Sequence, residues 1–224
     1  MTKKPNTYFV SDTHFGHKNI ISFERGNKFN TIYEHDNFIC NLFHQWAISW
    51  KPESTLYFLG DFGDISKLYV FDEFINNNIE VHFVRGNHDN NISDEMLNEH
   101  GIIVHPYPIF LSQKLVISHF PVAVWDDTIN ICGHLHGAKL QPQNYINANI
   151  HVHNYNPVSM NEINSAFGKI TKYSRKFLEE PWANMYQFTQ KHKECISDHK
   201  GNIDLSASRA YRQYLHDSNN LEKF

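Results

Sequence analysis

The sequence predicts an α/β protein in which strands and helices alternate along the first half of the chain. Three short apolar, β-prone runs are each followed by a polar turn and then by apolar residues at helical spacing. After about residue 100 the chain becomes richer in strand-like runs. This order implies a layered core of sheets and helices, and 224 residues are enough to bury one.

The first half of the chain contains the clearest elements. Strands are expected at residues 8–10, 56–59 and 81–84, because each is a short apolar run that stops at a polar turn. Helices are expected at residues 31–50, 68–75 and 93–100. Thr31 is a suitable N-cap for the longest of them.

The second half begins with an expected hairpin. Its strands are residues 109–111 and 115–118, joined by Ser112-Gln113-Lys114. A further strand is expected at residues 129–132 and another at 145–152. On the last of these, His151 and His153 would share one face, because alternate residues of a strand point the same way.

The charge distribution separates the chain into two parts. Residues 1–164 hold 10 basic and 17 acidic residues, whereas residues 165–224 hold 10 and 7. We expect a catalytic domain at 1–164 and a helical C-terminal extension of unknown role at 165–224. The acidic body argues against a broad nucleic-acid interface. The basic, aromatic extension leaves nucleic acid open as a partner, although an amphipathic helix packed on the body is the favoured interpretation.

The cysteines and the hydropathy indicate the setting. Cys40, Cys132 and Cys195 are widely spaced and form no CxxC pair, which argues against a disulfide framework and a thiolate zinc site. No signal-peptide core and no run of about 18 apolar residues is present. We therefore expect a cytoplasmic protein without a membrane partner. The sequence leaves the oligomeric state open.

Five polar stretches carry the candidate chemistry, and each directly follows an apolar, β-prone run. In chain order they are Asp12-Thr13-His14, Gly60-Asp61-Phe62-Gly63-Asp64, Gly86-Asn87-His88-Asp89, Ser118-His119 and Gly133-His134-Leu135-His136. Taken singly each motif is weak. Ligand sites in open α/β sheets lie at the carboxyl ends of the strands, so the five loops should converge.

The order of these motifs resembles that of the calcineurin-like metallophosphoesterase family, over about residues 8–160. The segments SDTHFGHKNI and VHNYNPVS also resemble a small bacterial and phage branch of that family. The resemblance implies a layered αββα fold, with two packed mixed β-sheets flanked by helices. It also implies a binuclear metal-dependent phosphoesterase.

The resemblance assigns a role to each motif residue. One metal ion would be held by Asp12, His14, Asp61 and His136. A second would be held by Asp61, Asn87, His119 and His134, so Asp61 would bridge the two ions. His88 would act beside the metals without binding them, and Asp64 would orient His88.

The expected ligand set suits divalent transition metals. Imidazole, carboxylate and amide donors fit Mn²⁺ first, with Fe, Ni, Co or Zn as other candidates, whereas Mg²⁺ favours oxygen alone. In such centres two metals roughly 3.5–4 Å apart clamp the attacking and leaving oxygens and generate a hydroxide near neutral pH. We therefore expect a metal-bridging hydroxide to hydrolyse a phosphate ester.

The substrate is less constrained than the reaction. Arg85 could bind the substrate phosphate, with an exposed loop salt bridge as the alternative, and His17 could contact the substrate, with a surface histidine as the alternative. We favour a phosphodiesterase acting on a nucleotide-derived substrate, because His88 could assist a poor alkoxide leaving group. A phosphomonoesterase, including a protein phosphatase, is the next hypothesis. A catalytically idle metal-binding interaction module is the alternative of another class.

Overall fold

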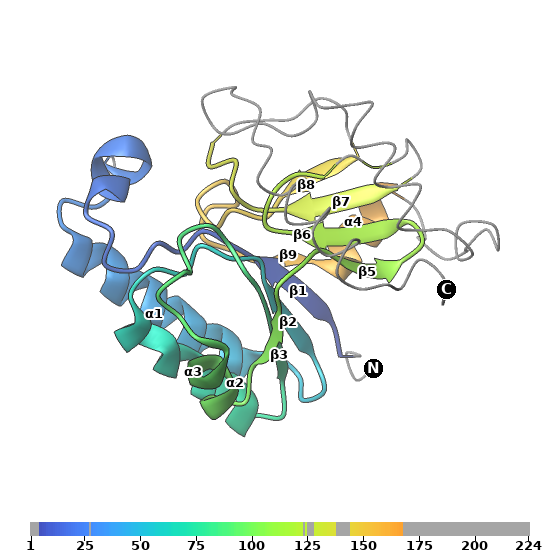
Figure 1. Ribbon diagram of the computed structural model, residues 1–224, viewed down its shortest axis with the longest axis horizontal. Coiled ribbons are helices and arrows are strands. Elements are labelled where there is room, and N and C mark those ends of the chain that lie inside the picture. The colour runs from blue at the N-terminus through green and yellow to red at the C-terminus, as the bar shows by residue number, and fades with distance from the viewer. Residues whose placement is uncertain (1–4, 27, 123, 125–127, 138–143, 168–224) are drawn as a thin grey trace.

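Two β-sheets packed against each other form the body of the computed structural model (Figure 1). The structure describes residues 5–26, 28–122, 124, 128–137 and 144–167. Both sheets mix parallel and antiparallel strands, and helices flank them, as the αββα architecture requires. None of the helices within these ranges has the length and apolar character that a membrane span demands.

The first sheet has five strands in the order β4-β3-β2-β1-β9. Four of them run parallel: β1 (Thr7–Val10), β2 (Thr55–Phe58), β3 (Glu80–Val84) and β4 (Ile103–His105). The short strand β9 (Val158–Ser159) pairs antiparallel with β1. The parallel strands therefore place their carboxyl ends at one edge of the sheet.

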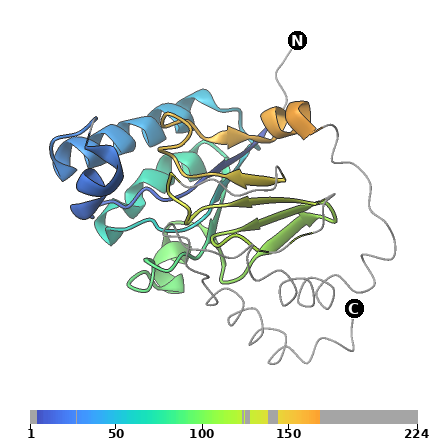
Figure 2. The same cartoon turned by 90° about the horizontal axis from the view of Figure 1, so that it is seen from above.

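Helices cover the outer face of this sheet (Figure 2). They are α1 (Ile32–Ser49), the 3₁₀ helix η2 (Ile65–Phe71), α2 (Asp72–Asn76) and α3 (Asp94–Glu99). As predicted, Thr31 caps α1 by accepting a hydrogen bond from the Glu34 N–H. Phenylalanine rings fill the layer between helices and sheet, and Phe43, Phe58 and Phe74 have no exposed surface.

The second sheet has four strands in the order β5-β6-β7-β8. They are β5 (Ile109–Ser112), β6 (Leu115–Ser118), β7 (Ile129–Cys132) and β8 (Tyr145–Asn147). Strands β5 and β6 form the expected antiparallel hairpin, whereas β6, β7 and β8 are parallel. Phe9 and Leu59 of the first layer pack in one cluster with Ile117 and Ile131 of the second.

Four elements were not expected from the sequence. They are the π-helix η1 (Ile21–Arg25), strands β4 and β9, and helix α4 (Met160–Phe167). Each is short, so its period is hard to read from the sequence. Helix α4 continues past residue 164, and residues 168–224 lie outside the described part, so the division at 164 stays a prediction.

The strand expected at residues 145–152 is wrong in its second half. Strand β8 ends at Asn147, and His151 and His153 lie in turns rather than on one strand face. Asn154 and Tyr155 adopt the left-handed backbone conformation, which a strand does not allow. The segment from residue 147 to 156 forms local turn hydrogen bonds, such as Asn154 N–H to His151 C=O, which replace a strand ladder.

Candidate metal centre

The five motif loops converge at the carboxyl ends of strands from both sheets. Asp12 and His14 follow β1, Asp61 follows β2, and Asn87 follows β3. In the second sheet, His119 follows β6, and His134 and His136 follow β7. Backbone bonds hold the loops together, since the Asp12 N–H donates to Gly60 C=O and the His14 N–H to Asp61 C=O. The convergence expected from strand polarity is therefore present.

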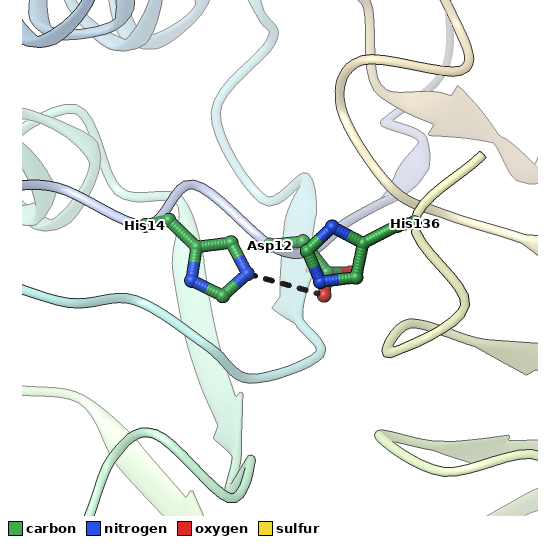
Figure 3. Close-up of side chains that lie close together, drawn as sticks. All are labelled: Asp12, His14 and His136. Carbon is green, nitrogen blue, oxygen red and sulfur yellow. Dashed lines mark ion pairs between the residues drawn. The ribbon is translucent and has the colours of Figure 1, made fainter. Parts of the chain in front are cut away.

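The side chains form two groups of possible metal ligands. Asp12, His14 and His136 make up the first, with ligand atoms within 4.8 Å of one another (Figure 3). Asp61, His119 and His134 make up the second by the same measure. Five of these six side chains are buried and His136 is partly exposed, so both groups lie at the bottom of the converging loops.

Asp61 lies between the two groups. Its Oδ1 is 3.3 Å from His119 Nε2, and its Oδ2 is 3.7 Å from His14 Nε2. The Oδ2 of Asp61 and the Nε2 of His14 are both buried and have no hydrogen-bond partner among the described residues. Because buried polar atoms are normally paired, this arrangement fits donor atoms directed at a metal ion. The Asp61 carboxylate faces histidines of both groups.

Asn87 extends the second group. Its side-chain oxygen lies 3.0 Å from His119 Nε2 and 3.1 Å from His134 Nδ1. An amide oxygen and two imidazole nitrogens thus face one point, from three different loops. Neutral amide and imidazole donors beside one carboxylate form a mixed nitrogen and oxygen set, which fits a transition metal.

The backbone at these positions adopts conformations that side chains rarely allow. Asp12, His14, Asp61, His134 and His136 all have positive φ values, between 50° and 65°. For a residue with a Cβ this conformation has a cost, and such strain concentrates at functional sites. The dense hydrogen bonds between the loops hold it in place. All five positions lie within four residues of the end of a strand, in the loops that bring the side chains together.

Two glycines allow the loops to approach this closely. A Cβ on Gly60, which has φ +86°, would lie 2.5 Å from Gly86 N and 2.7 Å from His119 Nδ1. A Cβ on Gly86 would lie 2.3 Å from Asp61 Oδ1. Any side chain at either position would therefore displace a candidate ligand.

His119 is oriented from both ends of its ring. Its Nδ1 lies 2.7 Å from the carbonyl of Leu59, and a donated Nδ1–H directs Nε2 toward Asp61 and Asn87. Burial by itself lowers the pKa of His119, but the charge and hydrogen bond of Asp61 outweigh it and raise the pKa to about 9. The Asp61 carboxylate therefore favours the charged form of His119.

His88 and His17 lie beside the first group without joining it. The His88 ring is exposed, and its centroid is 5.3 Å from that of His14 and 5.8 Å from that of His17. The His88 N–H donates to Asp61 Oδ1 at 2.9 Å, so the backbone of this turn is fixed while its imidazole faces solvent. Burial and the neighbouring His14 lower the pKa of His17.

The calcineurin-like phosphoesterase family model matches residues 5–224 of this chain. The chain belongs to the calcineurin-like phosphoesterase family. An uncharacterised protein of Methanocaldococcus jannaschii is 28% identical over 172 residues, which cover 70% of this chain and 88% of that protein. A solved structure of a protein of unknown function from Aquifex aeolicus superposes with a TM-score of 0.55 at 25% identity, covering 73% of this chain and 100% of that one.

Membership in the calcineurin-like phosphoesterase family supports metal-dependent hydrolysis of a phosphate ester. The two ligand groups are candidate sites for the divalent ions that this family implies. Each contains carboxylate oxygen and imidazole nitrogen in a buried setting, so the side chains present fit such ions.

The residues that support the ligands from behind were not predicted from the sequence. Glu24 of η1 lies with Oε2 3.3 Å from His136 Nδ1, and its side chain is 9% exposed. Arg25 is fully buried and donates to the carbonyls of Thr13, at 3.0 Å, and Asp12, at 2.5 Å. A histidine ligand commonly donates its second N–H to a carboxylate, which is the position that Glu24 occupies. No spacing in the sequence marks this contact, because η1 has no readable period.

Asp89 is a third supporting residue whose role the sequence did not indicate. Its buried carboxylate accepts hydrogen bonds from the N–H groups of Asp61 at 2.9 Å, Phe62 at 2.8 Å and Gly86 at 2.7 Å. Burial and the nearby Asp61 raise the pKa of Asp89. Asp89 therefore ties the loop after β2 to the loop after β3, which fixes Asp61 relative to Asn87.

Two predicted site residues make other contacts. The Asp64 carboxylate accepts from the Ser66 N–H at 2.9 Å and caps η2, so its contact with His88 stays a prediction. The Arg85 guanidinium pairs with Asp94 and donates to the carbonyls of Asp89, at 3.2 Å, and Ile92, at 2.5 Å. These contacts match the alternative of a loop salt bridge, and binding of a substrate phosphate by Arg85 stays a prediction.

Proposed function

We propose that this chain is a phosphodiesterase that hydrolyses a nucleotide-derived substrate at a binuclear metal centre, with Mn²⁺ as the preferred metal. The observation that carries the proposal is the position of Asp61. One buried carboxylate faces His14 of the first ligand group and His119 of the second, at 3.7 and 3.3 Å. A carboxylate shared between two ligand groups is suited to hold a pair of neighbouring ions, which lie roughly 3.5–4 Å apart in two-metal sites.

Each ligand group would hold one metal ion, and Asp61 would be shared by both ions. Asp12, His14 and His136 would hold one ion together with Asp61. Asn87, His119 and His134 would hold the other, also together with Asp61. When bound, the ions would supply Lewis-acid activation of the phosphoryl group and a nucleophile available near neutral pH.

The protein's own side chains would handle the leaving group and the orientation of the site. His88 is exposed beside the first group, and its imidazole is the proposed donor of a proton to the leaving oxygen. His17, 5.8 Å from His88 between ring centroids, is placed to contact the same substrate. Asp89 and Arg25 would hold the ligand loops in register, through their bonds to backbone N–H and C=O groups.

The proposed role of His88 rests on an alkoxide leaving group, which alkyl diesters and alkyl monoesters share. An alkoxide is a poor leaving group and gains from a proton donor, whereas a good leaving group does not need one. An exposed histidine beside the ligand groups is suited to that task. A cytoplasmic setting is proposed with it, in keeping with the free thiols of Cys40 and Cys132.

The test compares two p-nitrophenyl substrates before and after metal exchange. The full chain is stripped with EDTA, dialysed, and assayed on bis(p-nitrophenyl) phosphate and p-nitrophenyl phosphate, with and without added Mn²⁺. We expect activity only with metal, and a higher kcat/KM for the diester. A higher kcat/KM for the monoester would favour the phosphomonoesterase instead. Full activity in excess EDTA, with no metal found by elemental analysis, would overturn the metal centre.

A further inference from the structure

A pocket next to the metal centre extends the site toward one edge of the sheets. Its cavity volume is about 60 Å³, and it is partly open to solvent. This volume is well below the roughly 300–1,000 Å³ of a site for a whole small molecule, so the pocket suits one group of a substrate whose remainder lies outside it. Its walls come from the ends of β3, β4 and β6, the same carboxyl-terminal edge that carries the ligand loops.

The pocket and the second ligand group share a residue. His119 lines the pocket and also faces Asp61 and Asn87. Phe120, another lining residue, has its ring centroid 4.5 Å from that of His134. A phosphoryl group bound at the second ligand group would therefore lie beside this pocket.

The lining favours a flat apolar group. Pro106, Tyr107 and Pro108 form one wall, in the connection between β4 and β5, and Phe120 and Val122 contribute to the remainder. Tyr107 and Phe120 are only partly buried, and both line the pocket. Aromatic side chains stack on nucleobases with little dependence on the base. Arg85 also lines the pocket, and its guanidinium is held by Asp94 and by the carbonyls of Asp89 and Ile92.

We propose that this pocket is the subsite for the ring of the substrate, a nucleobase or another planar aromatic group attached to the phosphate ester. The inference rests on the proposed function, because the metal centre must hold the phosphoryl group beside it. It narrows the substrate from any phosphate ester to one that carries a ring.

The experiment measures binding of two phosphates to the full chain in Mn²⁺ by isothermal titration calorimetry. Thymidine 5′-phosphate carries a base, whereas methyl phosphate offers the same phosphate without a ring. We expect the nucleotide to bind more tightly, and Tyr107→Ala to reduce the ratio of the two affinities by about 5–150-fold, the scale of base stacking on an aromatic ring. Tyr107→Phe keeps the ring and should restore the ratio.

The matched control is Tyr33→Ala, since Tyr33 is a 74% exposed tyrosine on α1 that does not line the pocket. It should leave the ratio unchanged. Equal affinities of the wild type for both phosphates, or an unchanged ratio in Tyr107→Ala, would overturn the subsite while leaving the metal centre intact. A failed metal centre would instead abolish hydrolysis and methyl phosphate binding. Binding of methyl phosphate without binding of thymidine 5′-phosphate at millimolar concentration would overturn the subsite as well.

Discussion

The carboxylate of Glu24 can be changed without removing any proposed metal ligand. Its Oε2 lies 3.3 Å from His136 Nδ1, and the side chain is 9% exposed, so solvent screens this contact only weakly. Glu24→Gln keeps the shape and an oxygen acceptor but removes the charge that holds the imidazole and increases its basicity. We expect the variant to bind one of its two metal ions less tightly.

The expected size follows from the type of contact. Loss of a carboxylate partner behind a histidine ligand typically weakens metal binding by about 10–100-fold, or roughly 1.4–2.7 kcal/mol. Because Gln preserves a hydrogen-bond acceptor, the lower part of that range, near tenfold, is expected. The ion held by Asp12, His14 and His136 should be affected, and the ion held near His119 should not.

The assay is calorimetric titration of Mn²⁺ into metal-free protein, followed by elemental analysis of the metal-loaded protein. Circular dichroism checks that the variant folds, since Arg25 loses its neighbouring charge but keeps its bonds to the carbonyls of Asp12 and Thr13. The matched control is Glu73→Gln, which removes the carboxylate from the exposed pair of Glu73 with His44, away from the centre. If the folded Glu24→Gln variant binds both Mn²⁺ ions with the affinities of the wild type, the role of Glu24 behind His136 is refuted.

Three further predictions concern the centre itself. His88→Gln should reduce turnover of an alkyl ester by roughly 10²–10⁴-fold and turnover of a p-nitrophenyl ester by less, and it should leave the metal content unchanged. Equal losses of turnover for both esters would indicate that His88 stabilises the phosphoryl oxygens instead. Gly86→Ala should lower metal occupancy in elemental analysis, because its Cβ would lie 2.3 Å from Asp61 Oδ1, while Gly137→Ala, whose Cβ would meet nothing closer than 3.9 Å, should not. Mn²⁺ binding at pH 7.5 should release about one proton or more, measured by calorimetry in buffers of different ionisation enthalpy. The reason is that the raised pKa of His119, about 9, keeps the imidazole protonated until the metal displaces the proton, so the affinity should fall as pH decreases.

The fold was predicted from the sequence where the periodic signal is strong. Helix α1 and its Thr31 cap, and the strands that precede each motif, lie close to the expected positions. Strands β4 and β9 have three and two residues, which is too short for alternation to show. The error after Asn147 arose because apolar and polar residues also alternate in the turns around His151 and His153.

The motif loops were also predicted from the sequence, because each directly follows an apolar strand. The resemblance to the family named the seven candidate ligands within them, and their role as ligands stays a prediction. All seven lie at the converging loops. Their supporting residues were not predictable in the same way. Glu24 and Arg25 reach the centre through a π-helix whose position depends on tertiary packing, and the contacts of Arg85 with Asp94 depend on the path of a loop.

The most direct test of the central claim is the metal content of Asp61→Asn beside the wild type. The substitution removes one charge from the carboxylate that faces both ligand groups, with almost no change in shape. Elemental analysis after loading with Mn²⁺ and desalting should find two ions per wild-type chain, fewer in Asp61→Asn, and a matching loss of diester hydrolysis. Two ions per chain and a wild-type rate in Asp61→Asn would show that Asp61 does not bridge a metal pair.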